Sequence, residues 1–446
     1  MRPDQGMKKL FGHILLTAFI LLNAGSIYPQ SKLDSLKYSY KHSKSDEEKI
    51  ITTIEIGKEY IYSDFNIDSS LFYSTKSLEL NKEVNNKFWE SRILMNIGTA
   101  LIYKQELDSS LFYLQNALNI ASELDSIKLK TELFNLIGVS YYYKGEFEKT
   151  LENWEEELKL NKAIGNKEYI AQNYNNLGIV LKNMDRYEDA IFYYQEALKI
   201  EEELNDSANI ARALNNIGNI YFHNRNNYIH ALQYYQKALK ISSALGEKEN
   251  EAILLNNIGL IYDNQKKFSD ALINFKKALE IFIVLRKDDK IAETHNFLGV
   301  LYAKMGNFRL ASEYIQKSYS FYTTAGATPR IAETLRDQGD IYLEWGKYEE
   351  ALHSYFKSYE ISLELGRKSD IADLYKKISE TYTKLNNYKK ALEFHLQATK
   401  LNDSLFSEKV NRQIAEFQTL YETEKKDKAI ALLNKDKALQ DAQLKR

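Results

Sequence analysis

The sequence predicts an all-α solenoid of about nine helix pairs, and three observations lead to this fold class. An apolar residue, a glycine and usually a tyrosine three residues later recur at intervals of 40 or 41 residues. Each interval holds two amphipathic segments, and proline is almost absent. Self-similarity at a period of about 20–50 residues is typical of stacked repeats. The marker positions are Gly57, Gly98, Gly138, Gly178, Gly218, Gly259, Gly299, Gly339 and Ser379.

The composition fits a long helical protein and excludes several classes of function. A chain of 446 residues is too long for one ordinary domain, whereas the core of a solenoid grows in one direction. Only three prolines occur, which suits helices because proline costs a helix about 3 kcal/mol relative to alanine. The net charge of −2 gives no electrostatic reason to expect a nucleic-acid partner. Because cysteine is absent, disulfides, thiolate catalysis and cysteine-based zinc sites are excluded.

Residues 1–30 have the order of a secretory signal peptide. Lys8 and Lys9 precede an apolar run over 14–22, and small residues follow it. The run is shorter than the roughly 20 residues that a membrane-spanning helix needs. We therefore expect an exported protein, periplasmic or secreted, with no integral membrane segment in the mature chain. An uncleaved anchor and a buried first helix are the alternatives. A lead-in helix is expected over 31–45.

The helix pairs are expected over 46–402, and the stretch 171–200 shows how one pair is encoded. Apolar residues between Tyr174 and Leu181 recur three and four positions apart, which is the period of a helix. The polar residues at 185–186 interrupt this pattern before a second helical run begins. Two amphipathic helices joined by a short turn form an antiparallel hairpin.

The marker glycines are expected where helices approach closely. Each glycine costs a helix about 1 kcal/mol relative to alanine, so eight of them in register need a compensating reason. Small residues twelve and nineteen positions later, such as Ala190 and Ala197, flank a large one such as Tyr194. We therefore expect neighbouring hairpins to nest at this contact. His395 occupies the large position of the last pair, so we expect it to pack in the core.

These features resemble the tetratricopeptide repeat, which implies a right-handed superhelical solenoid with a concave groove lined by the first helix of each pair. The resemblance covers 46–402 and is weaker in the first three pairs. Two departures from the family pattern are a period of 40 residues in place of 34 and the absence of the proline after the second helix. The second helix ends instead at a glycine, as at Gly165, Gly246, Gly326 and Gly366.

The C-terminal segment 403–446 is expected to form a long helix with coiled-coil tendency. Val410, Ile414, Phe417 and Tyr421 follow a four-three-four spacing before a charged interruption. This short seam leaves open a homodimer through the helix or a single solvated helix. The segment resembles the helix that follows the repeats in bacterial sensor histidine kinases with tetratricopeptide sensor regions. No membrane helix or kinase follows the repeats in this sequence.

The sequence offers no motif for catalysis or for a cofactor. No pair of histidines has metal-binding helical spacing beside a carboxylate, and no phosphate loop, dinucleotide fingerprint or nucleophile elbow is present. We therefore expect no catalytic residue, no metal and no cofactor. A secreted α/α-barrel hydrolase is the enzyme alternative, although such a fold would not need glycine in register.

Polar residues recur beside the marker glycines on the first helix, where the resemblance places the groove. A row of asparagines offers both donors and acceptors to the backbone of an extended peptide, and charged residues replace it in the later pairs. The candidate groove residues are Asn96, Asn135, Asn176, Asn216, Asn257, Asn219, Arg336 and Lys376. The alternative is that the amides tie neighbouring first helices together or face water.

We therefore interpret the sequence as a non-catalytic scaffold that binds a protein or peptide segment. The signal peptide and the resemblance favour a periplasmic sensory or interaction module of a signalling system. A cytoplasmic regulatory protein with tetratricopeptide repeats is the main alternative.

Overall fold

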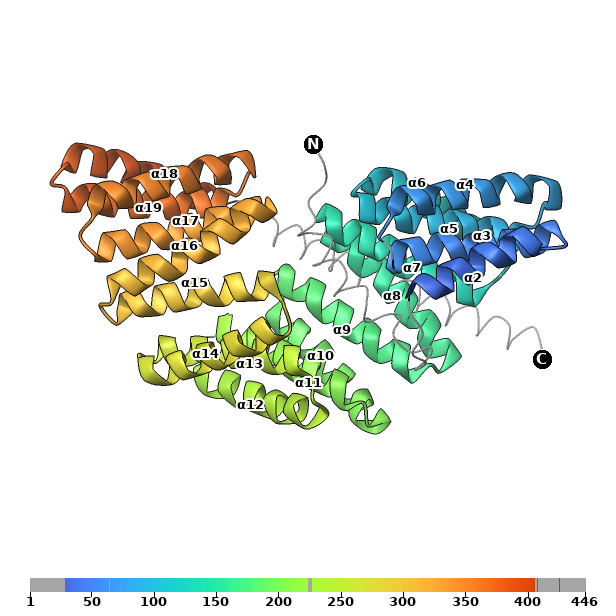
Figure 1. Cartoon of the computed structure of the whole chain (residues 1–446), viewed down its shortest axis with the longest axis horizontal. Coiled ribbons are helices and arrows are strands. Elements are labelled where there is room, and N and C mark those ends of the chain that lie inside the picture. The colour runs from blue at the N-terminus through green and yellow to red at the C-terminus, as the bar shows by residue number, and fades with distance from the viewer. Residues whose placement is uncertain (1–28, 64, 224–226, 406, 408–424, 426–446) are drawn as a thin grey trace. The chain divides into compact units, whose positions relative to one another are not determined.

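The computed structural model describes residues 29–63, 65–223, 227–405, 407 and 425, and these residues form helices joined by short turns, without strands (Figure 1). Nearly all of the predicted signal peptide and most of the predicted C-terminal helix lie outside the described residues. The chain divides into two compact units, residues 1–287 and 288–446, and each is described by itself.

Helix pairs fill both units, and the helix that carries the marker residue is called the first helix of its pair. In the first unit, α2 (Pro29–His42) packs on α3, which begins the series. The pairs of this unit are α3 (Asp46–Tyr62) with α4 (Ile67–Val84), α5 (Lys87–Lys104) with α6 (Leu107–Glu123), α7 (Ile127–Lys144) with α8 (Phe147–Ile164), α9 (Lys167–Asn183) with α10 (Tyr187–Leu204), α11 (Ser207–His223) with α12 (Tyr228–Leu245), and α13 (Lys248–Asn264) with α14 (Phe268–Val284).

The second unit continues the same pattern. Its pairs are α15 (Asp288–Lys304) with α16 (Phe308–Ala325), α17 (Thr328–Glu344) with α18 (Tyr348–Glu364), and α19 (Lys368–Lys384) with the helical residues 388–405. Within each unit, every second helix packs against the first helix of its own pair and, where another pair follows, against the first helix of that pair. Clusters of buried apolar residues extend across consecutive pairs, as from α5 to α9, and the predicted all-α solenoid of helix pairs is confirmed.

Local signals at the turns explain where the helices begin and end. The Asn166 side chain accepts a hydrogen bond from the backbone N–H of Tyr169 and so caps the start of α9. Gly165 and Gly246 end α8 and α12 with φ of 77° and 72°, a left-handed conformation that glycine adopts without steric cost. Gly326 ends α16 in the same way. Gly366 directly follows Leu365, the C-cap residue of α18, and is also left-handed. The predicted glycine stops are therefore confirmed.

Most marker glycines lie where two helices approach closely, as expected. A Cβ atom on Gly178 would lie 2.6 Å from the ring of Tyr194, and one on Gly339 would lie 2.4 Å from the ring of Tyr355. Carbon atoms in ordinary contact are about 3.5–4.0 Å apart, so neither position has room for a side chain. The partner ring comes from the second helix of the same pair. The contact therefore joins the two helices of one hairpin, and not two neighbouring hairpins as we expected.

The last pair departs from this arrangement. Ser379 replaces the glycine, and its hydroxyl donates a hydrogen bond to the carbonyl oxygen of Ala391 at 2.7 Å. The serine side chain thus occupies the space that receives a large residue in other pairs. His395 is exposed, so the prediction that this histidine packs in the core is wrong.

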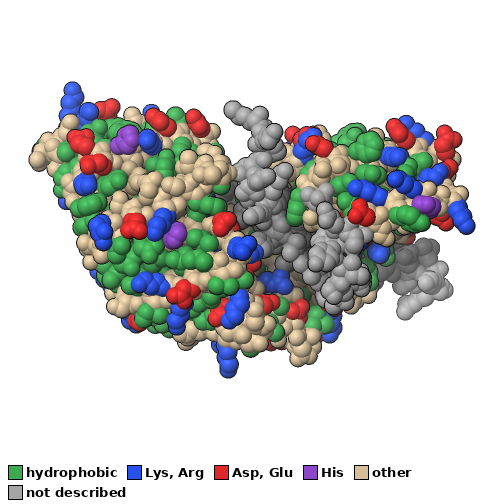
Figure 2. All heavy atoms as spheres, viewed as in Figure 1, with side chains coloured by type: hydrophobic (Ala, Val, Ile, Leu, Met, Phe, Trp, Pro, Cys, Tyr) green, Lys and Arg blue, Asp and Glu red, His purple; other side chains and the backbone are tan. Residues whose placement is uncertain are grey.

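Charged side chains of both signs are dispersed over the visible face of each unit (Figure 2). This distribution agrees with the small net charge. Neither unit presents a surface of a single sign on that face, so the arrangement adds no case for a nucleic-acid partner.

Candidate functional site

The candidate site is one face of the first helices, which we call the first-helix face. It consists of the residues two or three positions before the marker and one, four or five positions after it. Residues spaced three and four apart share one face of a helix, so these positions form a stripe along each first helix. On α9 the stripe includes Asn176 and Lys182, and on α11 it includes Asn216, Asn219 and His223.

Three of the predicted groove asparagines hold neighbouring helices together. The Asn96 amide is buried and donates to the carbonyl oxygen of Ile54 on α3 at 2.9 Å. Asn257 donates to Asn215 on α11 at 2.9 Å, and Asn135 donates to the Glu157 carboxylate on α8 at 3.0 Å. For these three residues the structure therefore matches the alternative interpretation, in which the amides link neighbouring helices.

Other members of the predicted set have polar groups without a partner among the described residues. Asn176 and Asn216 are half-buried, and neither amide has a hydrogen-bond partner within the described residues. Asn219 accepts a hydrogen bond from the Tyr235 hydroxyl at 2.8 Å, and its amide N–H groups have no partner among the residues that the structure describes. Lys376 on α19 is exposed and forms no ion pair with any residue that the structure describes.

In the second unit the charges of the first-helix face pair with one another. Arg336 lies 3.2 Å from the Asp337 carboxylate, which also accepts a hydrogen bond from Asn296 at 2.6 Å. Burial raises the pKa of the Asp337 carboxyl, and the Arg336 charge opposes this shift. Lys377 donates to Asp340 at 2.8 Å. The mixed charges predicted for this part of the surface are present, and most of them are internally compensated.

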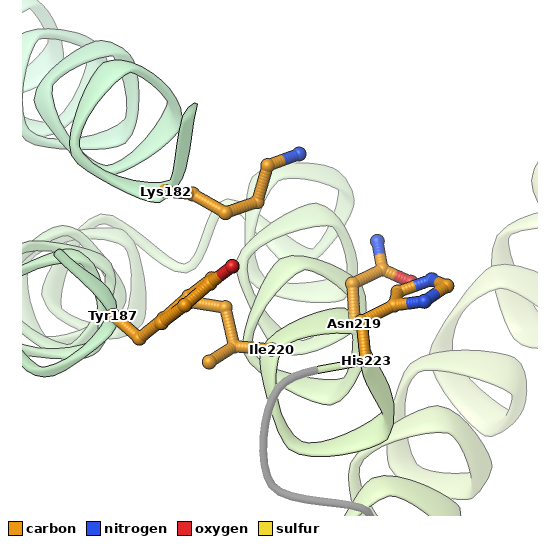
Figure 3. A pocket seen from close by; sticks show the side chains of 5 residues that line it. All are labelled: Lys182, Tyr187, Asn219, Ile220 and His223. Atoms are coloured by element: carbon orange, nitrogen blue, oxygen red, sulfur yellow. The ribbon is translucent and has the colours of Figure 1, made fainter. Parts of the chain in front are cut away.

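A pocket of about 330 Å³ opens in the first unit, on the first-helix face between α9 and α11. Its lining residues are Lys182, Tyr187, Asn219, Ile220 and His223 (Figure 3). The first helices α3 and α5 pack closely side by side, whereas α9 and α11 approach each other less closely. The wider spacing leaves the room in which the pocket forms.

The pocket includes only one residue of the predicted set, Asn219. Lys182, Tyr187 and His223 were not predicted as site residues. Lys182 lies four positions after its marker and His223 five positions after its own, so both belong to the stripe by register. The sequence shows no sign, however, that these two side chains face one hollow, because they come from different pairs.

Two carboxyl groups are buried close to the first-helix face. Burial raises the pKa of Glu157 to about 7, although hydrogen bonds from Asn135 and Asn173 oppose the shift. Burial likewise raises the pKa of Glu201 to about 7, and a hydrogen bond from Asn175 opposes this shift. Both groups are therefore close to half-protonated at neutral pH.

The described part of the chain shows neither a metal centre nor a membrane span. No group of three or more histidine, aspartate or glutamate side chains is arranged there to hold a metal ion. None of the helices described combines the length and hydropathy that crossing a membrane requires.

The stacked hairpins and the polar first-helix face define a helical repeat protein. A family model described as "Tetratricopeptide repeat" matches residues 131–203, 209–283 and 290–364, which together make up half of the chain. The chain therefore belongs to the tetratricopeptide repeat family. The matched segments begin in the third helix pair, so they leave out the first two of the three pairs in which a weaker pattern was expected and include the third. No curated protein matches the sequence.

Several solved structures share this fold. The apo form of RapI is 20% identical, with a TM-score of 0.57, and the match covers 76% of this chain and 98% of RapI. Aspartyl phosphate phosphatase F from Bacillus subtilis is 16% identical, with a TM-score of 0.56 and coverage of 79% and 94%.

A third structure holds a bound peptide. The Rap conjugation gene regulator of the plasmid pLS20, in complex with the Phr* peptide, is 16% identical, with a TM-score of 0.54 and coverage of 80% and 96%. At these identities the likeness shows a common fold.

Proposed function

We propose that this protein is a non-catalytic scaffold that binds a peptide or protein segment along its first-helix face. The observation that carries the proposal is the pair Asn176 and Asn216, whose half-buried amides lack a hydrogen-bond partner within the described residues. Both side chains are partly exposed and so within reach of a ligand, and an extended peptide backbone supplies both the donors and the acceptors that an amide needs. The fold shared with a peptide-bound Rap regulator supports the same proposal.

The test begins with selection of a binding peptide from a random peptide library against the full chain. The variant with Asn176→Ala and Asn216→Ala is then titrated with the selected peptide. Each lost hydrogen bond is worth about 0.5–1.5 kcal/mol, so the Kd should rise roughly 5- to 100-fold. Helicity should stay unchanged, because neither amide holds a described helix.

A matched control uses two asparagines on second helices. Asn153 on α8 and Asn274 on α14 are also half-buried, and each donates only to a carbonyl oxygen of its own helix. The variant with Asn153→Ala and Asn274→Ala should bind the peptide as the wild type does. An unchanged Kd for the first variant, or an equal loss in the control, contradicts the assignment of the site.

We also propose that the protein is exported and acts as a sensory or interaction module of a signalling system. The support is the order of charged, apolar and small residues over 8–26 and the resemblance to the sensor regions of histidine kinases. Mass spectrometry of the mature protein tests the export step. Cleavage shortly after the small residues is expected, whereas an intact Met1 or Met7 in the cytosol favours the cytoplasmic regulatory alternative.

A further inference from the structure

The pocket between α9 and α11 gathers nitrogen donors from two helix pairs. Figure 3 shows the Lys182 amino group, the Asn219 amide and the His223 ring around one hollow, with the Tyr187 ring as its opposite wall. The orientation of Asn219 is fixed by its own partner, because its carbonyl oxygen accepts a hydrogen bond from the Tyr235 hydroxyl at 2.8 Å. The amide nitrogen of Asn219 is therefore the atom that faces the pocket.

None of the described residues that line the pocket is acidic, and its cation is Lys182. Lys182 forms no ion pair with the residues that the structure describes. The nearest acidic group on the same turn, Asp185, accepts a hydrogen bond from the Tyr187 hydroxyl at 2.7 Å. Burial lowers the pKa of Lys182, and burial together with the Lys182 charge lowers the pKa of His223. An anion bound beside Lys182 stabilises the charged form of this partly desolvated amine, and the His223 ring offers an N–H donor to the same anion.

We propose that this pocket binds a carboxylate or phosphate group, held by the Lys182 ammonium group, the Asn219 amide nitrogen and an N–H group of His223. Charge-assisted hydrogen bonds of this kind are roughly twice as strong as neutral ones. The volume of about 330 Å³ lies at the lower end of the roughly 300–1,000 Å³ range of small-ligand sites, so an acidic side chain or a small free anion fits.

This inference deepens the proposed function, because the pocket lies on the first-helix face and its anion is an acidic group of the bound peptide. A free small anion offers the same chemistry. Anion binding is measurable without any peptide, so failure of the pocket and failure of the peptide site give different results.

Isothermal titration calorimetry of the full chain with inorganic phosphate, and separately with acetate, tests the pocket at constant ionic strength. The wild type should bind at least one of the two anions saturably, and chloride should not replace it. Lys182→Met should weaken binding by about ten-fold or more, because a hydrogen bond to a charged group is lost. Lys159→Met is the matched control, since Lys159 on α8 is an exposed lysine outside the pocket, and its variant should bind as the wild type does.

A second variant changes the charge of the pocket without changing the packing of its side chains. Asn219→Asp has nearly the same shape and can still accept from the Tyr235 hydroxyl, but it places a negative charge in the pocket. It should abolish anion binding while the circular dichroism spectrum stays that of the wild type. Absence of saturable binding of either anion to the wild type, or wild-type affinity in both Lys182→Met and Asn219→Asp, overturns the proposal.

The peptide selected above identifies the source of the anion. If Lys182→Met weakens both phosphate and peptide binding, the group belongs to the peptide. If it weakens phosphate binding alone, the pocket takes a free anion beside the peptide. Both results support the anion pocket. If the protein binds phosphate but no peptide, the proposed peptide-binding function is rejected and the anion pocket is not.

Discussion

Gly178 and Tyr194 show how a single residue sets the distance between two helices. The Tyr194 ring occupies the space where a side chain at residue 178 would be, 2.6 Å from an ideal Cβ. Tyr194 is almost fully buried there. The cost of a glycine within a helix is therefore offset by the packing of a large side chain from the second helix.

Gly178→Ala should lower the free energy of unfolding by about 1–2 kcal/mol. Overpacking costs about 1–3 kcal/mol, and the better helix propensity of alanine returns up to about 1 kcal/mol. In a Tyr194→Ala background, the same change should stabilise the protein, because only the propensity term remains. Urea denaturation of the four proteins measures both steps. If Gly178→Ala destabilises the Tyr194→Ala protein as it does the wild type, this explanation is contradicted.

At the residue scale, the sequence predicted the large partner of glycines such as Gly178, but not the partner of each asparagine. The marker glycine and the large residue sixteen positions later belong to one pair, so their register is visible in the chain. Asn96 and Asn257 donate to atoms 42 residues away, on the preceding first helix. Whether an asparagine side chain bonds to a neighbouring helix or stays available to a ligand depends on the distance between two helix pairs. A single sequence does not reveal this distance.

At the scale of the element, α8 carries a carboxyl group at a position where α10 has Ala197. Glu157 lies nineteen residues after its marker, where small residues are typical, and its side chain is buried. It accepts hydrogen bonds from Asn135 on α7 and from Asn173 on α9. A buried carboxyl group therefore joins three consecutive helices, an arrangement that the repeat pattern alone did not predict.

The stability of the protein should depend on pH through Glu157. Its pKa is about 7 in the folded protein, against about 4.3 in the unfolded chain, so the folded state binds the extra proton between these values. The contribution of Glu157 to stability should then be fully present below about pH 4.5 and be lost as the pH rises through about 7. Glu157→Gln should reduce the difference in unfolding free energy between about pH 5 and pH 7.5 by roughly 1–3 kcal/mol.

Urea denaturation at the two pH values provides the comparison. Glu201 has a similarly raised pKa, so part of the pH dependence should remain in the Glu157→Gln variant. Glu156→Gln, at an exposed neighbouring position on α8, should leave the pH dependence of the wild type unaltered. The same pH dependence in Glu157→Gln as in the wild type contradicts the role given to this residue.

At the scale of the whole molecule, the all-α series of helix pairs was predictable because a period near 40 residues repeats along the chain. The division into units of residues 1–287 and 288–446 was not predicted, since the marker spacing continues unchanged across that point. The pocket was also missed, because it depends on how far apart α9 and α11 lie. The repeat thus predicts where a binding surface runs, but not which of its polar groups are free.

The central claim is that the ligand lies on the first-helix face. Photo-crosslinking tests it most directly, with a photoreactive amino acid placed at Asn216 on α11 or at Gln236, an exposed residue of α12 in the same pair. Mass spectrometry then locates the crosslinked peptide. The account predicts crosslinks from position 216 and none from position 236. Crosslinks from position 236 without any from position 216 would contradict it.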